Sequence, residues 1–457
     1  MLFSSSAFLF VFLPVVCLGY FLIGARFRNG FLLLASLFFY GWGEPRYVAV
    51  MLAVIFANYA AGIGMVRYAR FAKWILGADV VLNLSILIFF KYTNFLIENW
   101  NAMTEATVSP LHVVMPIGIS FFIFQALSYA FDVYRGEARC QKDLSKLALY
   151  VALFPQLVAG PIVKYQDIAG SLDCRSTRAA DIIYGVQRFI IGLSKKVLIA
   201  NTMGSVADSV YGTGTAHLTW EVAWLGAIAY SLQLFFDFSG YSDMAIGLGR
   251  IFGFRFRENF NYPYIATNMT DFWRRWHISL SSWFKEYLYI PLGGSRGSAA
   301  RTTWNLFLVF LATGIWHGAS WNFVVWGLWN GFFVILEKRW KWLRFDSGIG
   351  HVYVILAFVI GWVWFRADNL QMAVEYIAVM FGFRQGIPLY GWEYYVTPKH
   401  WLAGAAAVAF CVPWNWDALK QHSLFSWCYD LCLLCFLVLS VIRVAASTYN
   451  PFIYFRF

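Results

Sequence analysis

The sequence predicts an all-α integral membrane protein of about 11 to 13 helices, and three observations carry this prediction. Hydrophobic residues make up 60% of the chain and charged residues only 13%, whereas a soluble domain carries roughly 25% charged residues. Apolar runs of about 17 to 20 residues, long enough to cross a hydrocarbon core of ~30 Å, recur from one end of the chain to the other. The polar breaks between them are short, so residues 1–457 are expected to form a single polytopic domain.

Each apolar run is a candidate membrane helix, and some are expected to be tilted or re-entrant. The first run is expected to remain as a helix, because no positive charge precedes it and no small-residue cleavage site follows it. The run over 303–337 is long enough for two helices. The candidate spans lie near residues 5–24, 30–43, 46–64, 74–92, 112–132, 147–163, 181–200, 220–249, 303–337, 350–366, 400–413 and 424–445.

The formal net charge of +11 would suggest a nucleic-acid partner in a soluble protein. Here the basic residues fall in short breaks between apolar runs, which is typical of positive-inside sorting, and no nucleic-acid partner is expected. The breaks around Glu44 and over residues 98–105 are poor in basic residues, so the N-terminus is expected on the outer side. The breaks expected on the cytoplasmic side carry Arg26, Arg28, Arg67, Arg70, Lys73, Arg135, Arg139, Lys142, Lys146, Lys338, Arg339, Lys341 and Arg344.

Seven cysteines without framework spacing do not suggest a disulfide scaffold. Cys428, Cys432 and Cys435 lie at i, i+4 and i+7 of an apolar run, so they share one helix face. We expect them to be small core residues rather than redox or metal-binding groups.

Ionisable residues are costly inside a bilayer, and each one therefore raises a functional hypothesis. The first place is "DFWRRWHISLSSWFKEYLYIPLGG", residues 271–294, whose aromatic and leucine residues repeat at helical spacing and predict one amphipathic helix. The stripe consists of Trp273, Trp276, Leu280, Trp283 and Tyr287. The candidate N-caps are Asn268, Thr270 and Asp271, and the candidate stop is formed by Pro291, Gly293 and Gly294.

This segment is basic as well as amphipathic. Between Arg250 and Arg301 there are eight lysines or arginines against three acids, which favours an anionic neighbour. Lipid headgroups and a phosphate-bearing donor both fit that description. His277 lies one residue past the aromatic stripe, where either a structural or a functional histidine would fit.

The second place is "TGIWHGASWNFVVWGLWNG", residues 313–331. His317 ends one apolar run and is followed by Gly318, Ala319 and Ser320 before the next run begins. Such a break lets the backbone open around a cavity at membrane depth, and small residues allow close approach of a substrate or helix. A histidine exchanges protons near neutral pH, so His317 is either a catalytic or relay group or a hydrogen-bonded core residue.

The third place is "FFDFSGYSDMAIGLGR", residues 235–250. Asp237 and Asp243 are six residues apart, about 240° around a helix, so they do not form a carboxylate pair. We expect each to pair with an arginine of another helix, with an ion or proton pathway as the alternative.

Motifs of several enzyme classes are absent from the sequence. It contains no H-E-x-x-H, no Walker A sequence, no G-x-G-x-x-G set and no H-x-x-x-x-D motif at His277 or His317. Its one G-x-S-x-G match, residues 293–297, lies in the predicted helix stop and not at a strand-to-helix nucleophile elbow. Hydrolytic triads, nucleotide hydrolysis and zinc chemistry are therefore disfavoured.

Taken together, these blocks resemble the membrane-bound O-acyltransferases, most closely the bacterial branch that serves alginate O-acetylation. The resemblance covers nearly the whole chain, from "LFSSSAFLFVFLPVV" to "NPFIYFRF", and includes "PIGISFFIFQALSYAFDVYRG", "FPQLVAGPIV" and the three segments above. It implies a ring-like helical bundle with a central tunnel that connects a cytoplasmic acyl donor to an acceptor on the far side. It also implies that His317 is the catalytic residue and that His277 is a second polar residue of the site.

The same resemblance implies an acetyl donor, a membrane and protein partners. Acetyl coenzyme A is the expected acyl donor, with no permanently bound cofactor and no metal. Its phosphates would be held by Arg274, Arg275, Arg296 and the backbone amides of Gly293 and Gly294, although a bare turn explains those glycines equally well. The family implies the bacterial inner membrane, polysaccharide-export machinery and an extracytoplasmic acetyltransferase. Two alternatives stay open, namely D-alanyl transfer to teichoic acid from a carrier protein and a non-catalytic transporter.

Overall fold

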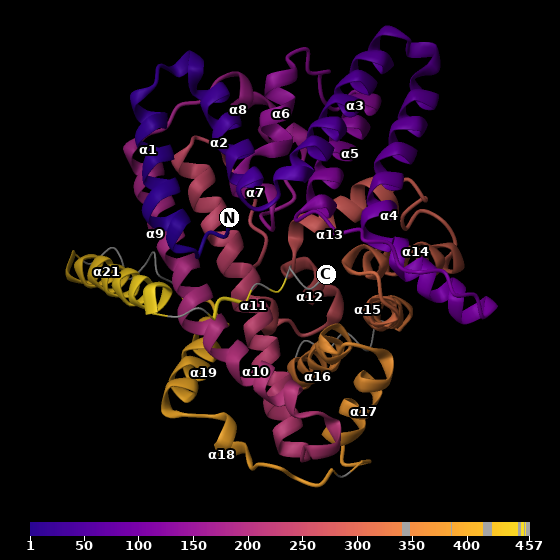
Figure 1. The fold of residues 1–457 in the computed structure, drawn as a ribbon, viewed down its shortest axis with the longest axis vertical. Helices are drawn as coiled ribbons and strands as arrows, with labels where there is room; N and C mark the ends of the chain where they lie inside the picture. The colour runs from indigo at the N-terminus through magenta and orange to yellow at the C-terminus, as the bar shows by residue number, and fades with distance from the viewer. Residues whose placement is uncertain (341–347, 385, 415–422, 447–448, 452, 454–457) are drawn as a thin grey trace. The chain divides into compact units, whose positions relative to one another are not determined.

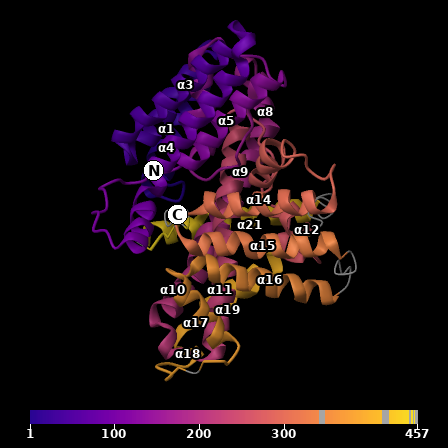
Figure 2. The ribbon, with the colours of Figure 1, turned by 90° about the vertical axis from the view of Figure 1, so that its right-hand side faces the viewer.

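The computed structural model describes residues 1–340, 348–384, 386–414, 423–446, 449–451 and 453. The regular elements in these ranges are all helices, and the ranges contain no β-strand (Figures 1 and 2). Contacts group the chain into two compact units, one of Met1–Phe189 with Met244–Arg257 and one of Ile190–Asp243 with Glu258–Phe457. The single domain over residues 1–457 remains a prediction.

The first unit is built around α5, which is buried on nearly every side. It packs against α3, α4, α6 and α8, while α2 packs against α1 and α6. An aromatic core of Phe3, Phe8, Phe12, Phe39 and Phe154 joins the N-terminal turn to these helices. The helices are α1 (Leu13–Leu22), α2 (Arg28–Gly43), α3 (Val48–Arg67), α4 (Ala72–Thr104), α5 (Ile119–Arg135), α6 (Leu144–Ala152), α7 (Phe154–Leu157), α8 (Tyr165–Asp173) and α9 (Ala179–Ser194, up to Phe189 in this unit).

The prediction of one helix over residues 147–163 is wrong. The helix ends at Ala152, Leu153 leaves the helical region with a ψ of 111°, and the short α7 follows with Pro155 in its first turn. Proline has no N–H to donate and is tolerated only at such a helix start. Two elements therefore replace one span.

The second unit contains the segments that the sequence analysis singled out. The helix α14 packs against α15, and α15 against α16, as the stack in Figure 2 shows. A π turn (Lys195–Ala200) precedes α10 (Asn201–Thr213). The remaining helices are α11 (Trp220–Ile251, up to Asp243 in this unit), α12 (Met269–Arg275), α13 (Ile278–Phe284), α14 (Ala299–His317), α15 (Trp321–Arg339), α16 (Gly348–Arg366), α17 (Leu370–Met380), α18 (Trp392–Tyr395), α19 (Pro398–Phe410) and α21 (Ser423–Ala446).

The predicted division of residues 303–337 into two helices is confirmed, with the break at 318–320. Glycine allows the two helices to approach closely. A Cβ atom at Gly327 of α15 would lie 2.5 Å from the carbonyl oxygen of Phe310 on α14, closer than carbon and oxygen can pack. The small residues of this block therefore set the spacing of α14 and α15.

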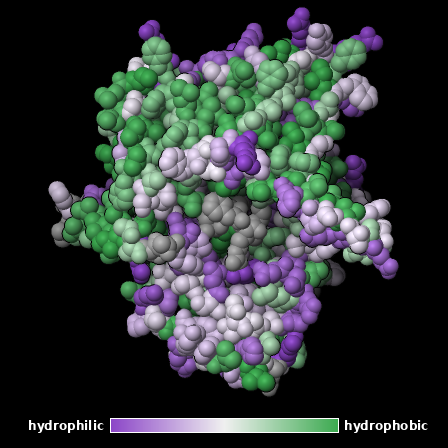
Figure 3. All heavy atoms as spheres, viewed as in Figure 1, coloured by the Kyte–Doolittle hydropathy of each residue, from purple (hydrophilic) through white to green (hydrophobic). Residues whose placement is uncertain are grey.

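Five helices within the described residues are long and apolar enough to cross a membrane, which confirms an all-α integral membrane protein. They are Pro45–Arg67, Ala69–Thr104, Trp220–Ile251, Gly348–Arg366 and Trp427–Ala446. Figure 3 shows hydrophobic side chains covering most of the visible surface over α1 to α4 of the first unit. The total of 11 to 13 helices stays a prediction, because other apolar helices, such as Phe8–Leu22, are shorter.

The structure also tests the predictions for three cysteines and two basic residues. Cys428, Cys432 and Cys435 lie on one helix, α21, but all three are exposed. Their prediction as core residues is therefore wrong, because the candidate span in α21 has only 11% of its residues buried. Lys341 and Arg344, predicted in a cytoplasmic break, lie outside the described residues.

Candidate active site

The amphipathic segment folds as two short helices, so the prediction of one continuous helix is wrong. The break falls at His277, whose φ of 43° and ψ of 54° are left-handed values that residues other than glycine rarely adopt. The predicted N-cap is confirmed at Asn268, whose side chain accepts a 2.8 Å hydrogen bond from the amide of Asp271. The stripe residues Trp276, Leu280, Trp283 and Tyr287 are nevertheless all buried.

A buried carboxylate fixes the start of α12. Glu337 of α15 has no exposed surface and accepts hydrogen bonds from the amides of Met269 and Thr270 at 2.6 and 2.8 Å. The hydroxyl of Tyr353 on α16 donates to the same carboxylate at 3.1 Å. Because a helix N-terminus attracts negative charge, this contact ties α12 to the stack of α15 and α16.

The loop before α12 fixes the break. Asn259 has no exposed surface, and its backbone oxygen accepts from the amide of Ile278 at 2.9 Å. Its side-chain oxygen lies 2.8 Å from Oγ of Ser279, 3.1 Å from the amide of Ser279 and 3.1 Å from Nδ1 of His277. Nothing in the sequence marks Asn259, since it lies 18 residues from His277 in a loop without a motif.

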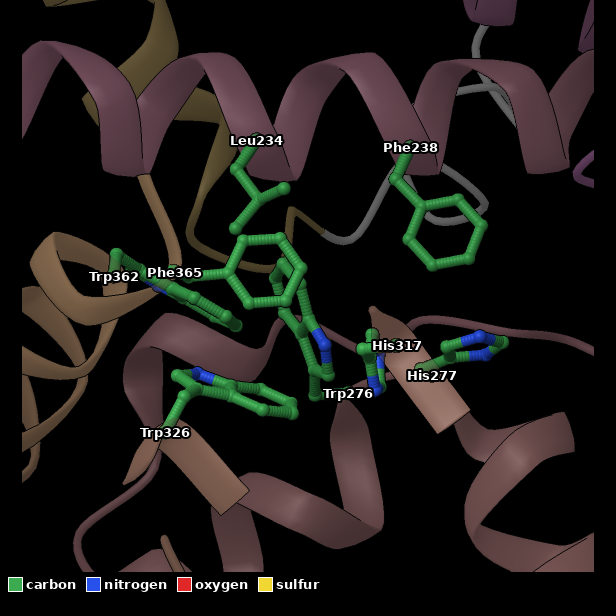
Figure 4. Close-up of a pocket in the computed structure, with 8 residues that line it drawn as sticks. All are labelled: Leu234, Phe238, Trp276, His277, His317, Trp326, Trp362 and Phe365. Atoms are coloured by element: carbon green, nitrogen blue, oxygen red, sulfur yellow. The ribbon is translucent and has the colours of Figure 1, made fainter. Parts of the chain in front are cut away.

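The two predicted histidines line one pocket (Figure 4). His317 is the last residue of α14 and is 7% exposed, and its Nδ1 donates to the carbonyl oxygen of Thr313 at 2.8 Å. His277 enters from the break between α12 and α13. The other lining residues come from α11, α15, α16 and the residue before the break, and they are Leu234, Phe238, Trp276, Trp326, Trp362 and Phe365.

Large aromatic rings wall this pocket. The ring of Trp326 lies 4.6 Å from the imidazole of His317 and 5.8 Å from the ring of Trp362, centroid to centroid. The ring of Trp276 lies 4.9 Å from Trp362, and Phe365 lies 5.5 Å from His317. The side-chain polar atoms of the lining residues are therefore few, namely the ring nitrogens of the two histidines and of the three tryptophans.

Burial sets the charge state of His277, which lies outside the five candidate spans. Burial, and then the charge of nearby His317, lowers the pKa of His277 well below its usual value. At neutral pH its imidazole is neutral, and a neutral imidazole has one ring nitrogen that accepts a hydrogen bond.

The residues predicted to hold the donor do not line this pocket. Arg274 and Arg296 are exposed, while Arg275 pairs with Asp271 at 2.7 Å. The amides of Gly293 and Gly294 donate to the carbonyl oxygens of Ile290 and Tyr289, both at 2.9 Å. These amides are already used inside the turn, and their role in holding phosphate stays a prediction.

The two aspartates of α11 form ion pairs, as predicted, but with lysines instead of arginines. Asp237 pairs with Lys196 at 2.6 Å and Asp243 with Lys195 at 2.7 Å. Neither aspartate lines the pocket. Among the described residues, no group of three histidine, cysteine or acidic side chains could hold a metal ion.

Comparison with known proteins shows the family of the chain. The family model of the membrane-bound O-acyltransferases matches residues 75–367. The chain is 44% identical to the probable alginate O-acetylase AlgI of Azotobacter vinelandii, over 84% of this chain and 78% of that protein. It is 34% identical to a peptidoglycan O-acetyltransferase of Helicobacter pylori, over 100% and 98%, and 28% identical to a teichoic acid D-alanyltransferase of Bacillus subtilis, over 54% and 67%. The chain therefore belongs to the membrane-bound O-acyltransferase family, as a multi-pass membrane enzyme that transfers acyl groups to oxygen.

Proposed function

We propose that this protein moves an acetyl group from a cytoplasmic thioester, acetyl coenzyme A, across the bacterial inner membrane for O-acetylation of an exported polysaccharide such as alginate. An extracytoplasmic acetyltransferase and polysaccharide-export machinery would be its partners. The observation that carries the proposal is the placement of His317 at the end of α14, in a pocket walled by aromatic rings.

In this reaction His317 acts as the general base. Its Nδ1 donates to Thr313, so in the neutral ring the lone pair is on Nε2. The hydroxyl oxygen of the acceptor attacks the thioester carbonyl carbon, an ester bond forms and the carbon–sulfur bond breaks. The hydroxyl proton passes to Nε2 of His317 and then to the departing thiolate, a role that contributes about 10²- to 10⁴-fold to the rate.

The size of the pocket favours a small acyl group. Its walls are the rings of Trp276, Trp326, Trp362 and Phe365, and tryptophan leaves less room than any other side chain. Such walls favour a group as small as acetyl, because a long acyl chain would need at least one ring to move. The D-alanyl alternative has less support, since the teichoic acid relative is less similar and matches only about half of the chain.

The test is acyl transfer by the purified protein and its His317→Gln variant. We expect radiolabelled acetyl coenzyme A to acetylate a hydroxyl acceptor with the wild-type protein, and the rate to fall by about 10²-fold or more in the variant. His400→Gln is the matched control, because His400 is similarly buried but bonds to Thr397 and Ser205 outside the pocket. Unchanged transfer by His317→Gln, or transfer only from a D-alanyl carrier protein, contradicts the proposal.

A further inference from the structure

The side-chain amide of Asn259 has a determined orientation. Its oxygen faces the backbone N–H of Ser279 at 3.1 Å, and a backbone N–H can only donate. The atom facing Ser279 is therefore the oxygen and not the nitrogen, although the two are alike in shape. The hydroxyl of Ser279 donates to the same oxygen at 2.8 Å.

This orientation determines the tautomer of His277. Nδ1 of His277 lies 3.1 Å from the same oxygen, which only accepts, so Nδ1 must carry the hydrogen. In the neutral ring Nε2 then carries the lone pair. Nε2 is buried and has no hydrogen-bond partner among the residues that the structure describes. A buried acceptor without a partner in a pocket is ready to receive a donor from a ligand.

Asn259 also holds the backbone at His277. The left-handed conformation of His277 costs about 1 to 3 kcal/mol, and the bonds from the amides of Ile278 and Ser279 to Asn259 hold the chain in it. Stability alone does not explain the asparagine, because its Nδ2 is buried without a partner among the described residues. An orphaned amide of this kind destabilises a fold.

We propose that Asn259 is a positioning residue of the acyl-transfer site, which holds His277 as the Nδ1–H tautomer so that Nε2 accepts a hydrogen bond from the acceptor hydroxyl beside His317. This inference rests on the proposed function. His277 orients the hydroxyl, and His317 removes its proton. Without Asn259 the ring is free to turn or to adopt the other tautomer, and the hydroxyl loses its second partner.

The charges around His277 leave this role intact at neutral pH. On α14, the titratable group that acts on its pKa is His317. On α12, Arg275 is already paired with Asp271 and Arg274 is exposed, and α11 presents the ring of Phe238 at 4.6 Å. A carboxylate at position 259 would therefore be the main new charge beside the imidazole.

Three variants test the role. Asn259→Leu removes the acceptor of Nδ1, and we expect kcat to fall by about 10²- to 10⁴-fold with little change in KM for the donor. Asn259→Asp keeps the acceptor and raises the pKa of His277, so activity is retained while the acid limb of the pH profile moves to higher pH. Ser279→Ala is the control, since it removes one bond to the same oxygen but not the bond to the histidine, and it should change kcat by about threefold at most.

Nitrogen NMR of the protein labelled with ¹⁵N-histidine gives a readout that does not depend on activity. The signal of His277, assigned by its loss in His277→Gln, should report hydrogen on Nδ1 in the wild type and in Asn259→Asp. Hydrogen on Nε2 in the wild type overturns the proposal, as does Asn259→Leu with wild-type kcat. If the wild-type protein transfers no acyl group at all, the proposed function fails, while the NMR result still decides the tautomer.

Discussion

Replacing Lys196 with methionine is expected to destabilise this protein by about 3 to 5 kcal/mol, and the same change at Lys195 should cost less, because that lysine is only partly buried. The two lysines are neighbours in one π turn, and each pairs with an aspartate of α11 at almost the same distance, 2.6 and 2.7 Å. Burial distinguishes them. The side chains of Lys196 and Asp237 are 3% and 2% exposed, while that of Lys195 is 26% exposed.

The magnitude follows from what is left after the change. In Lys196→Met the carboxylate of Asp237 stays buried, and the donor that remains to it among the residues that the structure describes is the amide of Ile453 at 3.0 Å. A buried charge that loses its partner costs several kcal/mol. The cost at Asp243, which is 6% exposed, should be smaller, because its partner Lys195 is 26% exposed and the pair is already partly screened. Lys196 also donates to the carbonyl oxygen of Pro451, so the variant releases one bond to the C-terminal segment as well.

The assay is the rate of heat inactivation of the purified protein in detergent, because multi-pass proteins often unfold irreversibly. Lys196→Met should inactivate much faster than Lys195→Met. The double variant Lys196→Met with Asp237→Leu should recover most of the loss, since it removes both charges together. Equal losses in the two methionine variants, or a double variant no better than the single one, would refute the reasoning.

Three further predictions concern the helices and the pocket. Gly327→Ala should push α14 away from α15, because the new Cβ would meet the carbonyl oxygen of Phe310. The variant should still insert into the membrane but should transfer acyl groups more slowly in a membrane assay. Trp326→Phe should raise the ratio of propionyl to acetyl transfer by about tenfold, because the smaller ring leaves room for one more methylene group. Competition between the two thioesters measures this ratio. Arg274→Gln should weaken donor binding more than Arg275→Gln, since Arg274 is exposed whereas Arg275 is paired with Asp271. Equal affinities of the two variants would make both arginines structural.

The sequence predicts the helices well where hydrophobic runs are uninterrupted. The spans near 220–249 and 350–366 correspond to α11 and α16, and the break inside 303–337 falls where small residues follow His317. The errors occur where tertiary contacts bend the chain. In residues 271–294 the buried stripe continues across a break in the helix. One helix is predicted there because periodicity indicates which side is buried and not whether the backbone is continuous.

The candidate site was predictable in part. His317 stands at a break between apolar runs, and that local pattern is visible in the sequence. Asn259 is joined to His277 by tertiary structure alone, and no local pattern marks it. The arginine predictions relied on total charge, yet Asp271 and Arg275 are four residues apart, a helical spacing at which an ion pair could have been predicted.

The two histidines cannot both take the proton of one hydroxyl. Each Nδ1 donates to an oxygen, His317 to Thr313 and His277 to Asn259, so each neutral ring offers only Nε2. The charge of His317 lowers the pKa of His277, and a proton on His317 therefore disfavours a second proton on its neighbour. In the proposed reaction this coupling gives the rings different tasks. His317 becomes the imidazolium that later protonates the thiolate. His277 stays neutral and accepts a hydrogen bond that orients the hydroxyl toward the thioester carbonyl.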